Sequence, residues 1–239
     1  MKDGYSKIEV NNHTVEISKI GGGVYRVDVK RGKEPIRSKY LIYDLENYEI
    51  SMSPSYLDRP VLVKFDNPIV IAGKSKKKVF ILLPIEVDVV AIRGNEEIVI
   101  ERITPENVKD AWFGEMHDGS ISYFYRSSVL GEPDPDVRKE SEVFIPVEIE
   151  NRDREQRNLE KLLIDSYQLS IYDVEGNWIS EKVKVEVYNN EVMVYYTDEP
   201  PARNAREIKK GEINIRKKGL EKLLKRSLGK IKPRFFSYG

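Results

Sequence analysis

Apolar and acidic residues alternate most regularly in the stretch 79–92, VFILLPIEVDVVAI. In an extended chain Ile85, Val87 and Val89 lie on one face, and the acidic residues between them lie on the other. A period of two residues is typical of a half-buried β-strand. A shorter stretch of the same order, VFIPVEIE at 143–150, repeats the pattern. We expect these two strands to be the centres of two β-rich halves.

Other alternating stretches predict antiparallel hairpins along most of the chain, separated by turn-forming pairs such as Asn189-Asn190. The predicted strand regions are 5–20, 24–29, 38–52, 61–72, 79–103, 143–150, 167–188 and 191–197. Residues 152–164 fit either a helix or an irregular strand, and we favour a strand because the neighbouring segments are strands. The fold class predicted is therefore mainly β, as two β-sandwich-like or barrel-like halves.

An acidic, proline-containing stretch at 131–142 is the predicted boundary between the halves, 1–130 and 143–239. Glu132, Asp134 and Asp136 could offer oxygen ligands to calcium. The intervening prolines favour an extended backbone that scatters these carboxylates around its axis. We therefore expect a solvated linker and no metal site.

Two short helices are predicted. The first begins at Thr104, with Pro105 in its first turn, and ends near Asp110. The second covers 217–229, where four leucines share one helical face before Gly229 ends it. A helix of about a dozen residues needs a surface to lie on.

Charge is distributed unevenly, although the chain carries 40 basic and 40 acidic residues in total. Residues 121–200 hold 9 basic and 18 acidic side chains, a net charge of −9, and residues 201–239 hold 13 and 3, a net charge of +10. The basic end can pair with the acidic middle, or bind a protein, a nucleic acid or a membrane surface. Its candidate anion-binding or partner-binding residues are Lys217, Lys218, Lys222, Lys225 and Arg226.

The absence of cysteine excludes disulfides, thiolate metal sites and thiol catalysis. No stretch is long and apolar enough to be a signal core or a spanning helix, so we expect a cytoplasmic protein. Abundant Lys, Glu, Arg, Ile and Val beside little Cys and Gln is typical of proteins from hot environments.

Aromatic residues gather in the segment 111–126, AWFGEMHDGSISYFYR. Aromatic rings beside an imidazole and charged groups can bind a sugar or another small molecule. The candidate ligand-binding residues are Trp112, His117, Asp118, Tyr123, Tyr125 and Arg126. The simpler interpretation, which we favour, is that the rings pack in a core or cover a strand.

The chain resembles an uncharacterised archaeal family that is known only as a domain of unknown function. The resemblance lies in the strand pattern of 79–103, the segment 112–126 and the strand VFIPVEIEN. The resemblance implies neither an activity nor a cofactor. No catalytic constellation is visible, so we expect a non-enzymatic binding or adaptor module with a protein partner or a second copy. The alternatives are an enzyme acting on a carbohydrate or small molecule at 112–126, and nucleic-acid binding through residues 203–236.

Overall fold

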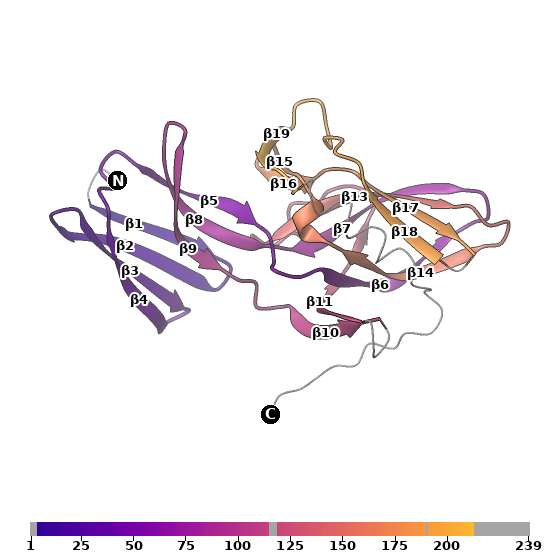
Figure 1. The fold of residues 1–239 in the computed structure, drawn as a ribbon, viewed down its shortest axis with the longest axis horizontal. Coiled ribbons are helices and arrows are strands. Elements are labelled where there is room, and N and C mark those ends of the chain that lie inside the picture. The colour runs from indigo at the N-terminus through magenta and orange to yellow at the C-terminus, as the bar shows by residue number, and fades with distance from the viewer. Residues whose placement is uncertain (1–3, 115–118, 190, 213–239) are drawn as a thin grey trace. The chain divides into compact units, whose positions relative to one another are not determined.

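The computed structural model describes residues 4–114, 119–189 and 191–212. These residues form nineteen strands and one 3₁₀ turn, so the protein is mainly β, as predicted (Figure 1). The strands belong to two compact units, each assembled from separate stretches of chain. The first unit comprises Met1–Ser55, Glu86–Pro105 and Lys139–Ser141, and the second comprises Tyr56–Ile85, Glu106–Arg138 and Glu142–Gly239.

The first unit contains an antiparallel sheet of order β1-β2-β3-β4 and a second sheet of order β5-β8-β9. Its strands are β1 (Tyr5–Val10), β2 (His13–Gly21), β3 (Val24–Arg31), β4 (Glu34–Ile42), β5 (Glu49–Ser55), β8 (Glu86–Arg93) and β9 (Glu96–Ile103). Alternate residues of β2 and β3 are buried, among them Val15, Val27 and Val29. Val87 and Val89 of β8 are also buried, as their alternation predicts, and so is Ile85, which precedes them and belongs to the second unit.

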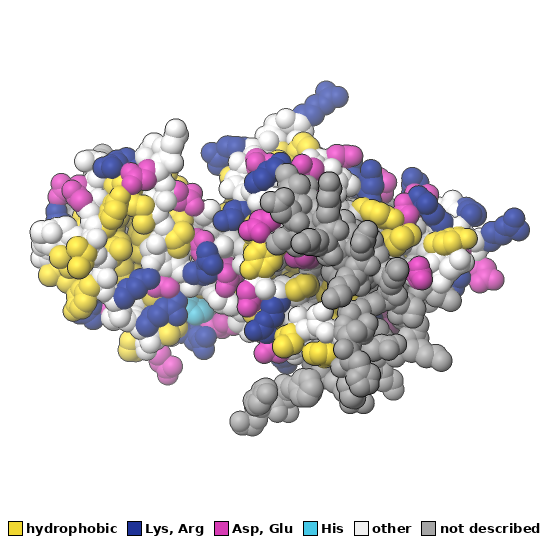
Figure 2. Space-filling model, viewed as in Figure 1, with side chains coloured by type: hydrophobic (Ala, Val, Ile, Leu, Met, Phe, Trp, Pro, Cys, Tyr) yellow, Lys and Arg dark blue, Asp and Glu magenta, His cyan; other side chains and the backbone are white. Residues whose placement is uncertain are grey.

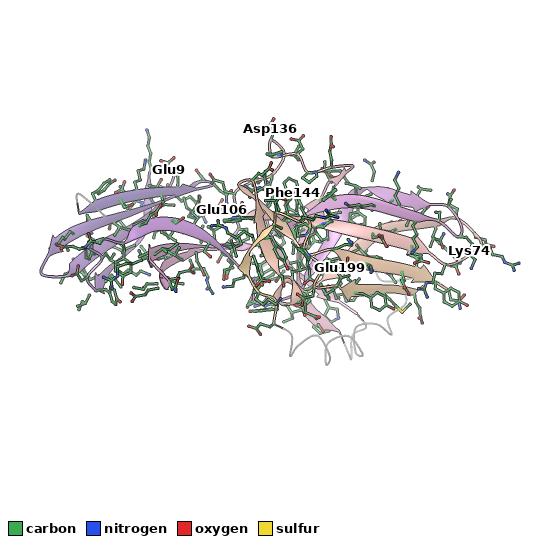
Figure 3. All side chains as sticks on the ribbon, turned by 90° about the horizontal axis from the view of Figure 1, so that it is seen from above. Glu9, Lys74, Glu106, Asp136, Phe144 and Glu199 are labelled. Atoms are coloured by element: carbon green, nitrogen blue, oxygen red, sulfur yellow. The ribbon has the colours of Figure 1, made fainter. Side chains whose placement is uncertain are left out.

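The second unit contains a sheet of order β10-β11-β6-β14 and a larger sheet built on β7 and β13. Its strands are β6 (Val61–Ile71), β7 (Lys76–Pro84), β10 (Lys109–Phe113), β11 (Ser120–Ser127), β12 (Val129–Leu130), β13 (Glu142–Asn151), β14 (Arg157–Ile164), β15 (Ile171–Val174), β16 (Asn177–Ser180), β17 (Val183–Tyr188), β18 (Glu191–Tyr196) and β19 (Arg206–Lys209). The 3₁₀ turn is Ser166–Gln168. One large cluster of buried apolar side chains forms the core of this unit. In Figure 3 the fully buried Phe144 lies among these strands and Lys74 lies at one end of them.

The two copies of the Val-Phe-Ile pattern lie side by side in the second unit. β7 and β13 pair antiparallel, with Val79 opposite Val147 and Ile81 opposite Ile145. The long alternating stretch does not continue as one strand, because β7 ends at Pro84 and β8 begins at Glu86 in the first unit. Proline cannot donate a ladder hydrogen bond, which makes it a natural strand end. The boundary at 131–142 between separately folding halves stays a prediction.

The predicted hairpins in 5–20 and 79–103 and the one formed by 182–197 are present as β1-β2, β8-β9 and β17-β18. The strand favoured within 152–164 is β14. The helix predicted from Thr104 is wrong, because these residues lead without a helix into β10. The sequence Thr-Pro-Glu also suits a turn, so the capping residues alone do not distinguish a helix start from a turn. The helix predicted at 217–229 lies outside the described residues.

Candidate functional site

The aromatic segment forms the β10-β11 hairpin, in which Trp112 pairs with Ile121. Trp112 is half-buried, and a Cβ added to Gly119 would lie 2.2 Å from its Nε1 atom. The indole therefore packs closely against the backbone of its own hairpin. His117 and Asp118 lie outside the described residues.

Three candidate residues of β11 have separate environments. Tyr125 is buried, and its hydroxyl donates a 2.5 Å hydrogen bond to Glu142 Oε1. Tyr123 is half-buried and donates to Asp58 Oδ1 at 2.8 Å. Arg126 is exposed and, by the alternation of a strand, points to the opposite face from both tyrosines. Ligand binding by this set stays a prediction.

Environment raises the pKa of both tyrosines. Burial, and then the hydrogen bond to Asp58, raises the pKa of Tyr123 to about 12. Burial, followed by the hydrogen bond to Glu142, raises the pKa of Tyr125 well above its ordinary value. Both phenols therefore keep their protons to a higher pH than an ordinary tyrosine and act as hydrogen-bond donors to these carboxylates.

Basic side chains also gather around a hollow of about 410 Å³ at one end of the second unit, lined by Lys74, Lys76, Glu150, Asn151, Arg152 and Tyr188. Its cations have partners within the protein. Lys76 Nζ lies 3.0 Å from Glu150 Oε2, and Arg152 donates to Glu186 at 2.5 Å. Lys74 Nζ donates to the carbonyl of Arg152 at 2.6 Å. This pairing weakens the hollow as an anion site. The predicted cations of the tail, from Lys217 to Arg226, lie outside the described residues.

The most exposed strand of the first unit is β4, at the edge of its four-stranded sheet. Among its nine residues only Leu41 is half-buried, and the other eight are exposed. Tyr40 and Ile42 are 69% and 82% exposed. They pair with Arg26 and Val24, on the face opposite the buried Val27 of β3. Tyr40 and Ile42 therefore form an exposed apolar strip. Figure 2 shows hydrophobic side chains gathered on the visible face of this unit.

The other face of β4 carries cations. Arg37 Nη2 lies 2.7 Å from Oε1 of Glu101 on β9, and Lys39 Nζ lies 3.0 Å from Oε2. Burial raises the pKa of the Glu101 carboxyl, but the two cations outweigh burial and hold it below its ordinary value. One carboxylate thus serves two cations, which leaves this face of β4 with an excess positive charge.

A groove of about 690 Å³ also lies in the first unit, lined by Gly4, Lys19, Tyr25, Glu46, Asn47, Tyr48 and Glu49. Tyr25, on β3, is fully buried, and its hydroxyl has no hydrogen-bond partner among the described residues. Lys19 forms an ion pair with Glu46, whose hydrogen bond raises the pKa of Lys19. The groove therefore combines a buried polar atom without a partner and a neutralised cation.

Tyr48 is held in the groove wall by its own contacts. Its hydroxyl donates to Glu96 Oε2 at 2.5 Å, and Tyr43 donates to Oε1 of the same carboxylate at 2.7 Å. The Arg93 guanidinium lies 4.4 Å from the centre of the Tyr48 ring. These two hydrogen bonds hold the pKa of Glu96 below its ordinary value. The wall beside Tyr25 is thus fixed by residues outside the groove.

Neither β4 nor the groove was singled out from the sequence. The alternation in β4 would place its apolar residues inward, whereas Arg37 and Lys39 face β9. Tyr25 stands in an alternating strand like an ordinary core tyrosine. The sequence signal for β4 as an unusual strand was limited to its two cations, because cations are unusual on the inner face of a strand.

Residues 1–228 match the model of the family described as Protein of unknown function (DUF432). The chain belongs to this family. The resemblance to a domain of unknown function is thereby confirmed, and the family description assigns no activity. No curated protein and no solved structure matches the chain.

Two absences hold for residues 4–114, 119–189 and 191–212. No group of three or more His, Cys, Asp or Glu residues is arranged to hold a metal ion in this part of the chain. No helix among these residues is long and apolar enough to cross a membrane.

Proposed function

We propose that this member of the DUF432 family is a non-enzymatic binding module that docks an extended segment of a partner protein along β4. The observation that carries the proposal is the exposure of this nine-residue edge strand, with Tyr40 at 69% and Ile42 at 82%. No described strand pairs with its second edge. An edge strand presents backbone donors and acceptors to which an added strand can bind.

The side chains of β4 define the chemistry of the partner. In an antiparallel pair, residues directly opposite each other point to the same face of the sheet. Partner residues opposite Tyr40 and Ile42 would therefore be apolar. Those opposite Arg37 and Lys39 would be acidic, because Glu101 supplies one carboxylate to two cations. The partner segment alternates apolar and acidic residues.

The same cations argue against a second copy of this chain as the occupant. Two β4 strands paired antiparallel about their centres would bring Arg37 and Lys39 of both copies together. Like charges placed opposite one another destabilise a strand pair. Inward-pointing charge on an edge strand is also a known protection against unspecific pairing.

The test is a fluorescence anisotropy titration of the full chain with a labelled nine-residue peptide that alternates valine and glutamate. A peptide alternating valine and lysine serves as the charge control. We expect the valine–glutamate peptide to bind, and the double variant Tyr40→Lys, Ile42→Lys to bind it at least tenfold more weakly. Tyr5→Lys is the matched control, because Tyr5 is 53% exposed on β1, at the other edge of the same sheet.

Equal binding of both peptides, no binding of either, or an equal loss in Tyr5→Lys would overturn the proposal. Sedimentation velocity of the free protein tests the alternative occupant, a second copy of this chain. A concentration-dependent dimer that the Tyr40→Lys, Ile42→Lys variant abolishes would show that β4 binds a second copy instead.

The net charge of +10 in residues 201–239 favours a second candidate function, contact of the basic tail with nucleic acid or an anionic membrane surface. This contact would be sensitive to salt, because it rests on charge. A low-salt anisotropy titration with single-stranded DNA tests the nucleic-acid form of the proposal. Binding that is absent, or unchanged by deletion of residues 213–239, would remove it. Three further predictions remain proposals. A thermophilic source rests on composition, an archaeal source on the family resemblance, and a cytoplasmic location on the lack of a stretch that is apolar enough for a signal core or a spanning helix.

A further inference from the structure

The groove of the first unit contains a buried polar atom that lacks the partner such atoms normally have. The hydroxyl of Tyr25 is fully buried and makes no hydrogen bond with any described residue. Buried polar side-chain atoms are in the large majority hydrogen-bonded, so an exception requires an explanation. Tyr25 is also one of the residues that line the groove.

The volume of the groove, about 690 Å³, falls within the range of ligand sites in proteins, roughly 300–1,000 Å³. Its shape is held by local structure. Asn47 adopts a left-handed conformation with φ of 65°, and Tyr48 N donates to the carbonyl of Leu45 at 3.2 Å. Gly4 allows a close approach on the other side, since a Cβ there would lie 3.1 Å from Lys19 Cβ. The groove is therefore largely formed before a ligand binds.

Charge restricts the class of ligand. Lys19 is the only cation among the lining residues that the structure describes, and Glu46 neutralises it. Glu49 adds a negative charge, so phosphate, sulfate and carboxylate ligands would be repelled. Among the remaining lining groups, the carboxylates accept hydrogen bonds, and the Asn47 amide both donates and accepts them. The phenol of Tyr25 can donate or accept a hydrogen bond. This mixture suits a neutral molecule with several hydroxyl groups.

The geometry points to a binding site for a neutral polyhydroxylated small molecule, such as a monosaccharide unit, in this groove, with one ligand hydroxyl hydrogen-bonded to Tyr25. The Tyr48 ring, held by Glu96 and Arg93, supplies a fixed wall beside the ligand. The site does not depend on docking along β4, and no chemical step is part of it.

The test titrates the full chain with three uncharged probes, methyl α-D-glucopyranoside, methyl α-D-mannopyranoside and methyl β-D-galactopyranoside, by saturation-transfer NMR and calorimetry. We expect at least one glycoside to bind, and Tyr25→Phe to weaken it at least tenfold. The free Tyr25→Phe protein should melt at the same temperature as the wild type or higher, because the substitution removes a buried hydroxyl without a partner.

Tyr56→Phe is the matched control, since the buried Tyr56 hydroxyl donates to the carbonyl of Leu169 at 2.5 Å. It should lower the melting temperature and leave glycoside binding unchanged. The inference fails if no probe binds, if Tyr25→Phe retains the affinity, or if it destabilises the protein as much as Tyr56→Phe. Binding of sulfate or methylammonium in place of the glycosides would assign the groove to another class of ligand and overturn the inference.

Discussion

Tyr125 of β11 donates its hydroxyl proton to Glu142 of β13 at 2.5 Å, and both side chains are buried, at 6% and 1% exposure. The two residues link the two sheets of the second unit through its interior. Asn107 also donates to Glu142, at 3.4 Å. An aromatic residue that resembles a ligand platform in sequence thus satisfies a buried carboxyl group in the fold.

Tyr125→Phe should lower the free energy of unfolding of the second unit. It removes a donor from a buried carboxyl group, and such a loss costs about 1–3 kcal/mol. Chemical denaturation monitored by circular dichroism measures the change. Tyr188→Phe is the control, because Tyr188 is 47% exposed and should change stability by less than about 0.5 kcal/mol. Equal stability of both variants would show that the buried hydrogen bond contributes nothing net.

Alkaline pH should destabilise the protein in part through Tyr123. Its pKa is about 12 in the fold against an ordinary value of 10.0, because of burial and the hydrogen bond to Asp58. Between these values the folded state keeps a proton that the unfolded state has lost. The free energy of unfolding therefore falls as pH rises from 10 through about 12. Tyr123→Phe should make this fall shallower in urea titrations across that range, and an unchanged slope would contradict the assignment.

Acid should weaken the contact between β4 and β9. The pKa of Glu101 is held below its ordinary value of 4.5 because Arg37 and Lys39 outweigh burial. The contribution of Glu101 is thus present above pH 4.5 and is lost as pH falls through the lowered pKa.

Glu101→Gln should lower the free energy of unfolding at pH 7 by about 1 kcal/mol, a small value because both cations are nearly half exposed. The difference from the wild type should shrink towards pH 3. Denaturant titrations at pH 7, 5 and 3 measure it, and a difference that stays constant with pH would contradict the ion-pair role.

Local pattern predicted the strands of this protein better than their pairing. The β8-β9 hairpin follows from alternation and a glycine turn, both of which are local. The pairing of β7 with β13 joins residues such as Ile81 and Ile145 that are far apart in sequence. Their common Val-Phe-Ile order was visible, but the order does not state that the two strands are neighbours. The chain order also does not reveal that β7 and β8 belong to different units.

The candidate sites were less accessible to sequence reasoning than the fold. A buried tyrosine with a bonded hydroxyl, such as Tyr125, and one without, Tyr25, occur in the same kind of alternating stretch. The difference depends on which atoms the fold brings within about 3 Å of the hydroxyl. The exposure of Tyr40 and Ile42 depends likewise on β4 being an edge strand, which follows from sheet order and not from composition.

Gly73 should tolerate no side chain. A Cβ at this position would lie 1.9 Å from the carbonyl oxygen of Arg154, and the backbone there cannot move aside as a flexible side chain can. Gly73→Ala should therefore lower the free energy of unfolding of the second unit by about 1–3 kcal/mol or more, because overpacking typically costs this much. Gly131→Ala is the matched control, because its Cβ would meet no atom within 4 Å. Thermal unfolding of both variants separates steric conflict from the general effect of replacing glycine.

Replacing Asn151 with an acidic residue should destabilise the protein at neutral pH. It is fully buried, and its Nδ2 donates to the carbonyls of Ile71, Ala72 and Glu155 at 3.0, 3.1 and 2.8 Å. Its Oδ1 accepts from Asp153 N at 3.0 Å. The amide therefore closes the loops that follow β6 and β13.

Asn151→Asp would place a carboxylate oxygen against these three carbonyl oxygens. Each donor lost inside the fold costs about 1–3 kcal/mol, and a buried charge costs more, so the second unit should be strongly destabilised at pH 7. Protonation restores one donor and removes the charge. The pKa of the new carboxyl group should therefore be raised, and the variant should regain stability as pH falls towards 4, relative to the wild type. Denaturant titrations at pH 7 and pH 4 check the sign, and a deficit that grows on acidification would show that the amide does not hold the loops through its donor group.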